Sequence, residues 1–297
     1  LESAKAGDII IVAKSPTLKT GDTISTCKDE IPEDEINFPK PQIYYAVSPK
    51  NKNDDEKVGT ILSKLTEEDP TLDFYRNAET KQALKVAYRE TIKGKSDVQG
   101  KHKKQSGGHG QYGDVKIRFE RCENEFEFDE EIFGGSVPKQ YIPAVEKGLK
   151  ESMAKGILAG YPVSNIKATL YDGSYHDVDS SEMAFKMAAS IAFKKGMEEA
   201  QPVLLEPIMK LSITIPDEYM GDVMGDINKR RGKILGMEPT DNGKQLLIAE
   251  APQAETFKYA IDLRAMTQGR GYFEMEFARY AEVPNQIAEK IIAAAKK

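Results

Sequence analysis

The sequence contains no tryptophan, only two cysteines and only three histidines in 297 residues. Cys27 and Cys122 lie far apart and form no CxxC or similar ligand spacing, which argues against a disulfide framework and against a zinc site. No apolar run approaches the roughly 20 residues that a membrane-spanning helix needs, and no signal-peptide pattern begins the chain. These absences argue against a disulfide-rich secreted protein and a membrane protein, and they favour the cytoplasm.

Motifs for catalysis are also missing. Gly108, Gly110 and Gly113 match GxGxxG, but they follow a lysine-rich stretch and precede a strand, whereas a dinucleotide-binding loop follows a strand and opens a helix. Residues 94–96 resemble the end of a P-loop, yet Arg89 stands where its first glycine is required. There is no nucleophile motif and no HExxH motif. We therefore expect no catalytic residue, no metal and no cofactor in this chain.

The net charge of -6 and the pI near 5.4 are unusual for a nucleic-acid-binding protein, because phosphate contacts need cations. The distribution of charge matters more than the sum. Residues 93–104 contain five lysines and one acid, and they run directly into a glycine-rich loop. We expect this stretch to contact phosphates and the acidic residues 120–131 to repel RNA. A second basic cluster comprises Lys229, Arg230, Arg231 and Lys233.

The hydrophobic pattern of the first 85 residues predicts only parts of domains. Residues 1–27 have strand and turn patterns typical of the end of a β-barrel, and the start at Leu1 suggests a piece of a longer protein. Residues 28–85 predict a strand at 43–47, a helix at 54–66 and a strand at 72–75, which is half of a split βαβ domain. We expect a missing segment after Gln82, either deleted from the protein or omitted from this sequence, and we favour omission.

Residues 86–204 predict a complete α/β domain. Its expected elements are a strand at 115–119, a helix from about Pro138, a strand at 166–170 and a helix after residue 179. Asp179, with Glu182 three residues later, predicts the N-cap of that last helix. Apolar residues at helical spacing predict its buried face: Met183, Met187 and Ile191.

Residues 205–283 predict the βαββαβ order of a ferredoxin-like domain. Its expected elements are strand 209–215, helix 220–227, strands 234–237 and 246–249 around the turn at 241–243, helix 254–266 and strand 273–277. A final helix is expected over residues 284–297.

Two polar loops carry most of the functional information. Residues 106–113 read SGGHGQYG, in which four glycines of eight residues let the backbone approach a partner closely. Within this loop, Gln111 and Tyr112 supply hydrogen bonds and a stacking face. Residues 172–182 read DGSYHDVDSSE and end by starting a helix. Both loops lie at strand ends, so we expect them to meet at one pole of the domain.

These loops resemble the two tip loops of domain IV in bacterial elongation factor G, the ribosomal translocase. The resemblance continues through LAGYP at 158–162, AASIAF at 188–193, GDVMGD at 221–226 and GRG at 269–271. It implies an α+β multi-domain chain: the remnant of β-barrel domain II (1–27), an incomplete ferredoxin-like domain III (28–85), a ribosomal protein S5-like domain IV (86–204) with tip loops 101–113 and 171–180, ferredoxin-like domain V (205–283) and a C-terminal helix (284–297).

The resemblance also implies a function. The full-length factor is expected to be a monomer that binds the ribosome with GTP and magnesium, hydrolyses GTP in an amino-terminal domain absent here, and moves tRNA and mRNA. The tip would enter the A site and contact RNA of the decoding centre through Gly107, Gly108, His109, Gly110, Gln111, Tyr112, Gly113, Ser174, Tyr175, His176 and Asp177. Phosphates would be bound by Lys101, Lys103 and Lys104, and large-subunit RNA by Lys229, Arg230, Arg231 and Lys233.

Three alternatives remain open. His109 stands where this family commonly has arginine, which leaves room for a ribosome-recycling paralogue. A ribosomal protection protein would share the architecture but use a different tip loop. An RNA-processing enzyme would need His176 as a general base beside Asp177 and Asp179. We favour recognition over catalysis, because turn and capping roles explain the two aspartates.

Overall fold

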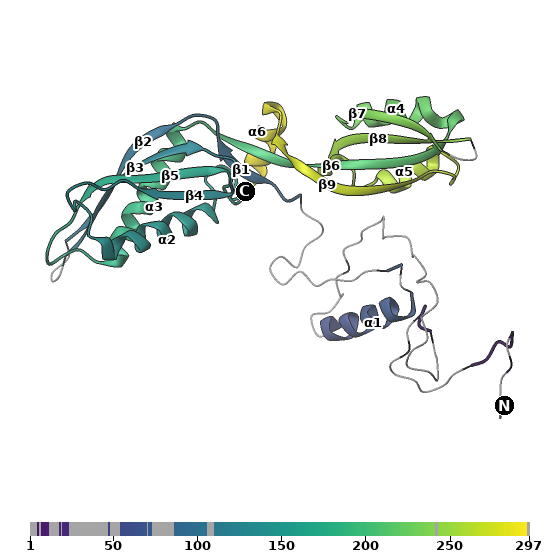
Figure 1. The fold of residues 1–297 in the computed structure, drawn as a ribbon, viewed down its shortest axis with the longest axis horizontal. Coiled ribbons are helices and arrows are strands. Elements are labelled where there is room, and N and C mark those ends of the chain that lie inside the picture. The colour runs from purple at the N-terminus through teal and green to yellow at the C-terminus, as the bar shows by residue number, and fades with distance from the viewer. Residues whose placement is uncertain are drawn as a thin grey trace. The chain divides into compact units, whose positions relative to one another are not determined.

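The computed structural model describes residues 5, 7–11, 18, 20–23, 47, 54–69, 71–72, 86–105, 110–240 and 243–295 (Figure 1). The chain forms two compact units. The first comprises Leu1–Lys85 with Phe257–Glu274, and the second comprises Val86–Thr256 with Met275–Lys297. Among the described helices, none combines the length and the apolarity needed to cross a bilayer.

The first unit contains helices α1 (Asp55–Glu68) and α5 (Tyr259–Met266). Helix α1 confirms the predicted helix and ends two residues later than expected, and its apolar residues Ile61 and Leu65 are exposed. The strand pattern expected within residues 1–27 is not seen at the described residues 8–11, which are not in a strand, and Ile9 is fully exposed. An isolated strand has no partner for its backbone hydrogen bonds. Residues 43–46, 73–75 and the expected gap after Gln82 lie outside the described residues.

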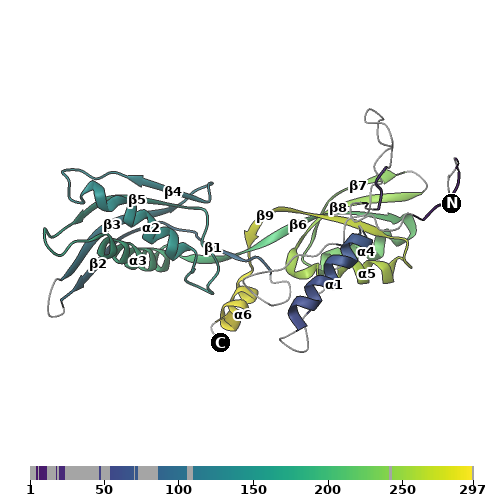
Figure 2. The same cartoon turned by 90° about the horizontal axis from the view of Figure 1, so that it is seen from below.

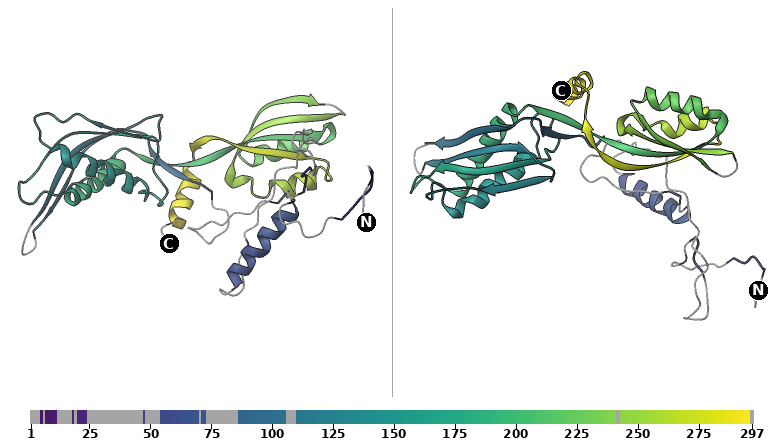
Figure 3. Two further views of the ribbon diagram at one scale, coloured as in Figure 1. Left: turned by 60° about the horizontal axis from the view of Figure 1, so that its bottom comes forward. Right: turned by 45° about the horizontal axis from the view of Figure 1, so that its top comes forward.

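The second unit contains a four-stranded sheet in the order β2-β3-β5-β4 (Figures 1 and 2). Its strands are β2 (Ser96–Lys104), β3 (Gln111–Arg121), β4 (Phe126–Glu130) and β5 (Ile166–Ser174). The pairs β2–β3 and β3–β5 are antiparallel, whereas β4 is parallel to β5. Helices α2 (Ile142–Met153) and α3 (Glu182–Glu199) cover one face, which Figure 3 shows from two further sides. These elements confirm the predicted α/β domain.

Helix α3 buries an alanine- and phenylalanine-rich face, and the predicted face is therefore wrong. Met183 and Met187 are exposed and Ile191 is only partly buried, whereas the residues packed inside are Ala184, Phe185, Ala188, Ala189, Ala192 and Phe193. Small side chains let the helix backbone lie directly on the sheet. A Cβ atom added to Gly100 of β2 would be 2.1 Å from the carbonyl oxygen of Ala188.

Replacing Gly100 with alanine is therefore expected to destabilise the second unit by about 3 kcal/mol, because α3 would have to move away from β2. A matched control is Gly225→Ala in helix α4 (Met220–Lys229), where an added Cβ has no neighbour within 4 Å. That change should be neutral or stabilise by up to about 1 kcal/mol through helix propensity. Urea unfolding followed by circular dichroism measures both. Equal stabilities for the two variants would contradict close packing of α3.

The start of α3 differs from the prediction in its cap. Ser181 is the N-cap, and its hydroxyl oxygen accepts a hydrogen bond from the backbone N–H of Ala184 at 3.2 Å. The predicted cap, Asp179, lies two residues earlier and is engaged elsewhere. The helix expected near Pro138 is confirmed as a 3₁₀ turn, η2 (Lys139–Tyr141), that leads into α2.

A five-stranded sheet carries the second half of the chain. Its strands β1, β6, β8 and β7 are hydrogen-bonded in that order, and β9 also pairs with β6. The bounds are β1 (Arg89–Ile92), β6 (Pro202–Pro216), β7 (Lys233–Thr240), β8 (Lys244–Pro252) and β9 (Tyr272–Glu282). Along the chain the order β6-α4-β7-β8-α5-β9 confirms the predicted βαββαβ pattern. Helix α6 (Asn285–Ala295) follows.

Strand β6 crosses the domain boundary that the sequence predicts. Its first residues pair with β1 and its later residues pair with β8. The boundary between residues 204 and 205 therefore falls inside one continuous strand.

Glu90 of β1 organises the loop that follows α2. Its side chain is buried, and its two carboxylate oxygens accept four backbone N–H groups. The donors and their distances are Ile157 (2.6 Å), Leu158 (2.9 Å), Ala159 (2.8 Å) and Tyr161 (3.1 Å). Next to this cluster, the rings of Tyr88 and Tyr161 lie 5.2 Å apart. One carboxylate thus determines the conformation of the whole loop.

Candidate functional site

The two polar loops singled out in the sequence meet at one end of the four-stranded sheet. The backbone N–H of Tyr112 donates to the carbonyl of Asp179 at 2.8 Å, and the N–H of Gly110 donates to the Asp179 carboxylate at 3.0 Å. The Ser180 hydroxyl donates to the carbonyl of Tyr112 at 3.0 Å. We call residues 101–105, 110–114 and 174–180 the tip. The expectation that both loops share one pole is confirmed.

Part of the tip is strand rather than loop, which corrects the sequence interpretation. Gln111, Tyr112 and Gly113 belong to β3, and they pair with Lys104, Lys103 and His102 of β2. The polar and glycine-rich sequence suggests an irregular loop, but residues 111–113 pair with β2 across the hairpin. Gly107, Gly108 and His109 lie outside the described residues.

The described glycines of the first loop are required by the protein's own packing. A Cβ on Gly110 would lie 2.7 Å from the Asp179 carboxylate, and a Cβ on Gly113 would lie 2.5 Å from the carbonyl oxygen of Ala184 in α3. Gly113 is buried. Close approach by these two glycines therefore joins the tip to α3 and to the second loop.

His176 is held in one tautomer by its own loop. Its Nδ1 accepts backbone N–H groups from Val178 at 3.3 Å and from Asp179 at 3.2 Å, so in the neutral ring the proton lies on Nε2. The side chain is 56% exposed, and its ring centroid is 6.4 Å from that of Tyr112. His176 thus carries a hydrogen-bond donor at Nε2 on an exposed side chain. The basic nitrogen of the neutral ring is already engaged, which argues against a general base.

Gln111, Tyr175 and Asp177 are exposed at the tip, and Ser174 is partly buried beneath them. The side-chain oxygen of Gln111 lies 2.9 Å from Nε2 of His102. A carbonyl oxygen can only accept, so His102 donates and the Gln111 amide nitrogen retains its two N–H donors. Gln111 and His176 therefore both offer hydrogen-bond donors to a partner.

The three lysines of β2 differ in their surroundings. Lys103 and Lys104 are exposed, whereas the ammonium of Lys101 lies 5.3 Å from the ring centroid of Tyr112 and 3.7 Å from the Asp114 carboxylate. Tyr112 first, and Asp114 second, raise the pKa of Lys101. All three side chains lie on one hairpin strand, so they can place positive charge beside the tip.

The second basic cluster is divided between internal and exposed cations. Arg230 pairs with Asp226 at 2.6 Å, and Arg231 pairs with Glu206 at 2.7 Å. Glu206 is buried, and its hydrogen bond raises the pKa of Arg231. Lys229 and Lys233, in contrast, are exposed. Arg231 holds the end of α4 against β6, and Arg230 donates to the carbonyl of Glu255 at 2.7 Å. The two lysines are therefore better placed for contact with a partner.

A third segment reaches the tip end of the sheet, and the sequence interpretation missed it. The loop after β4 starts with a hydrogen bond from Glu131 N–H to the carbonyl of Leu170, and the Tyr141 hydroxyl donates to the carbonyl of Ser180 at 3.3 Å. Between them, Phe133 is 94% exposed. Within the described part of residues 86–201, all exposed large hydrophobic side chains lie on this loop, the second polar loop or the first turns of α3: Phe133, Tyr175, Val178, Met183 and Met187.

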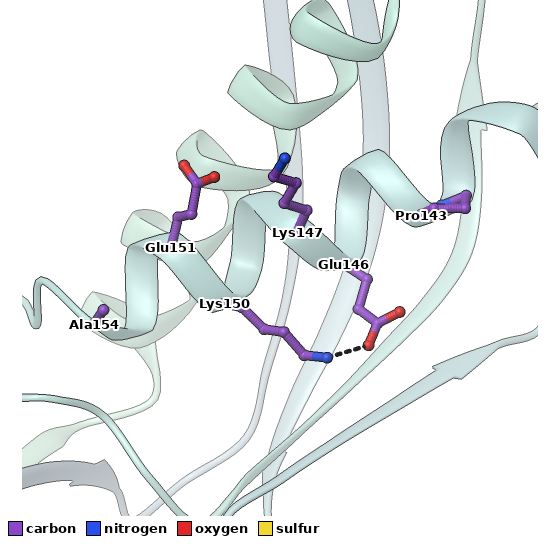
Figure 4. A pocket seen from close by; sticks show the side chains of 6 residues that line it. All are labelled: Pro143, Glu146, Lys147, Lys150, Glu151 and Ala154. Atoms are coloured by element: carbon purple, nitrogen blue, oxygen red, sulfur yellow. Dashed lines mark ion pairs between the residues drawn. The ribbon is translucent and has the colours of Figure 1, made fainter.

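Among the residues that the structure describes, no group of three or more His, Cys, Asp or Glu side chains could hold a metal ion. An open hollow of about 420 Å³ lies on α2 instead, lined by Pro143, Glu146, Lys147, Lys150, Glu151 and Ala154 (Figure 4). There Lys150 pairs with Glu146 at 2.6 Å, an ordinary surface ion pair between successive helical turns.

Comparison with protein families agrees with this geometry. Residues 38–86 match a model of elongation factor G domain III, residues 84–201 match a model of elongation factor G domain IV, and residues 203–291 match a model of the elongation factor G C-terminus. A solved structure of a protein from Thermus thermophilus is 42% identical, with a TM-score of 0.78. That match covers 93% of this chain and 45% of the solved chain, so this chain spans less than half of the solved protein's length. The chain belongs to the elongation factor G family, and it contains regions corresponding to domains III and IV and the C-terminus.

Proposed function

We propose that this chain is the ribosome-binding part of a translocase, which moves tRNA and mRNA through the ribosome in the cytoplasm. The matched regions are domain III, domain IV and the C-terminus, so GTP and magnesium would be bound by another part of the full-length factor. In this proposal, GTP is hydrolysed in that other part, and the tip binds RNA without catalysing a reaction.

The tip would enter the A site of the small subunit and contact RNA of the decoding centre. The observation that carries this proposal is the junction of the two polar loops, which brings Gln111, Tyr112 and His176 to one end of a rigid sheet. Donated hydrogen bonds, an aromatic face and neighbouring lysines suit RNA phosphates, 2′-hydroxyl groups and unstacked bases. The lysines involved are Lys101, Lys103 and Lys104.

Lys229 and Lys233 would contact RNA of the large subunit, with Arg230 and Arg231 shaping the turn between them. Support comes from the exposure of the two lysines beside the internally paired arginines.

The decisive experiment measures translocation and ribosome-stimulated GTP hydrolysis separately in tip variants of the full-length factor. Slow translocation with hydrolysis preserved supports the proposal, and unchanged rates of both reject it.

A further inference from the structure

Asp114 is a buried acid inside the tip that neither polar loop motif accounts for. It lies on β3, where the strand register places it opposite Lys101 of β2 and Ser174 of β5. Its side chain is 6% exposed. One carboxylate oxygen accepts the amide N–H of Gln99 at 2.7 Å, and the other accepts the hydroxyl of Ser174 at 2.9 Å. The central strand of the tip therefore carries a fully hydrogen-bonded carboxylate.

Because the Asp114 carboxylate can only accept, it determines which group donates in the neighbouring hydrogen bonds of Ser174 and Tyr112. Ser174 has a single hydroxyl proton, and that proton is donated to Asp114. The oxygens of Ser174 and Tyr112 are 2.7 Å apart, so Tyr112 must donate its own proton to Ser174. The chain of donation runs from Tyr112 through Ser174 to Asp114. The phenol oxygen of Tyr112 then has only acceptor capacity left for a partner.

Asp114 also restrains the cation that covers the ring of Tyr112. The Lys101 ammonium lies 3.7 Å from the Asp114 carboxylate and 5.3 Å from the centroid of the Tyr112 ring. Such a cation over an aromatic face is attracted by the electrons of the ring. Without the carboxylate, only the ring attracts the Lys101 ammonium, so the flexible side chain would lie over the ring less often.

We infer that Asp114 is a positioning residue, which turns Tyr112 into a hydrogen-bond acceptor and keeps Lys101 beside it. The matching partner group is a donor next to a phosphate, and the RNA 2′-hydroxyl has this chemistry. Tyr112 and Lys101 would therefore read the sugar-phosphate backbone of RNA as a pair. This inference rests on the function proposed above and adds the chemical group that the tip selects.

The test is Asp114→Asn in the full-length factor, with the rate of ribosomal mRNA movement as the readout. Asparagine keeps the shape but removes the charge and one acceptor oxygen, so we expect translocation to slow about tenfold, the usual effect of losing one charged hydrogen bond. The matched control is Glu151→Gln on α2, whose carboxylate pairs with Lys186 at 2.7 Å and belongs to neither polar loop and to neither basic cluster. That control should translocate at the wild-type rate.

A double-mutant cycle distinguishes positioning from a general contribution to folding. In a Tyr112→Phe background, the hydroxyl that Asp114 orients is gone and only its hold on Lys101 remains, so Asp114→Asn should slow translocation by clearly less than the tenfold expected with Tyr112 present. Ser174→Ala keeps the buried charge of Asp114 and should reproduce part of the translocation defect. It should also have a smaller effect in the Tyr112→Phe background. It replaces Asp114→Asn in the test if Asp114→Asn fails to fold.

A full additional effect in the Tyr112→Phe background would overturn the inference, as would a wild-type rate for both Asp114→Asn and Ser174→Ala. Variants of Gln111 and His176 separate this result from failure of the proposed function. If they slow translocation while the Asp114 and Ser174 variants do not, only the positioning role is wrong. If the wild-type factor does not move mRNA at all, the proposed function itself is wrong.

Discussion

Replacing Glu90 with alanine is expected to lower the free energy of unfolding of the second unit by about 4 kcal/mol, one of the largest effects of a single change in this chain. Four backbone N–H groups lose their acceptor at once, those of Ile157, Leu158, Ala159 and Tyr161. Each unsatisfied donor costs about 1 to 3 kcal/mol when it stays buried, and part of this loop can turn to water instead. The expected sum is therefore smaller than four full penalties.

Urea unfolding of the chain, followed by circular dichroism, measures this effect. Glu90→Gln should cost about half as much, because the amide keeps one acceptor oxygen but points an N–H group at donors. The control is Glu198→Ala, which removes an exposed glutamate near the end of α3 and should change stability by less than about 0.5 kcal/mol. A stability loss below about 1 kcal/mol for Glu90→Ala would mean that the loop does not depend on this carboxylate.

The double variant Gln111→Ala with His176→Ala is expected to slow translocation by the full-length factor about 100-fold, with ribosome-stimulated GTP hydrolysis within about twofold of wild type. Each side chain offers a donor, and a hydrogen bond to a charged acceptor contributes about 1.5 to 3 kcal/mol, or at least tenfold in rate. Hydrolysis should persist because the variants leave the lysines and the rest of the ribosome-binding surface unchanged.

Rapid-mixing fluorescence with labelled mRNA reports translocation, and phosphate release reports hydrolysis. The variant Glu198→Ala, remote from the tip on α3, should behave as wild type in both measurements. If the double variant moves mRNA at the wild-type rate, the assignment of the tip is wrong. If hydrolysis falls as much as translocation, the tip instead contributes to general ribosome binding.

The sequence predicts helices and strands well where the hydrophobic period of each element is contained within that element. The strand alternation and helical stripes of residues 205–283 predict all six elements of the βαββαβ order, because each pattern is contained within one element. The meeting of the two polar loops is predicted for a similar reason, since both lie at strand ends of one sheet. Their pairing requires no knowledge of which side chains touch.

The errors concern contacts between distant residues. Met183 and Met187 have helical spacing, but the closeness of α3 to Gly100 decides which face is buried, and that glycine is more than 80 residues away. Asp179 has the chemistry of a cap, yet Gly110 of the other loop engages it. The basic sequence around Arg231 predicts a free cation, whereas Glu206 on β6 pairs with it.

Asp114 shows the same limit at the site itself. In the sequence it is one acid at the edge of a glycine-rich motif, and no periodicity marks it. Only the strand register places it between Lys101 and Ser174. A buried carboxylate with two donors is therefore visible once the hairpin and β5 are paired, and not before.

The most direct measurement is hydroxyl-radical cleavage of ribosomal RNA from an iron chelate attached to the tip. In a background with Cys27→Ser and Cys122→Ser, the chelate is attached through Val178→Cys at the exposed tip or through Glu198→Cys, about 25 Å along α3 at 1.5 Å per residue. The factor is bound to the ribosome before cleavage. We predict strong cuts in small-subunit RNA of the decoding centre from position 178 and weak or different cuts from position 198. Cleavage confined to the large subunit, or identical patterns from both positions, would contradict RNA recognition by the tip.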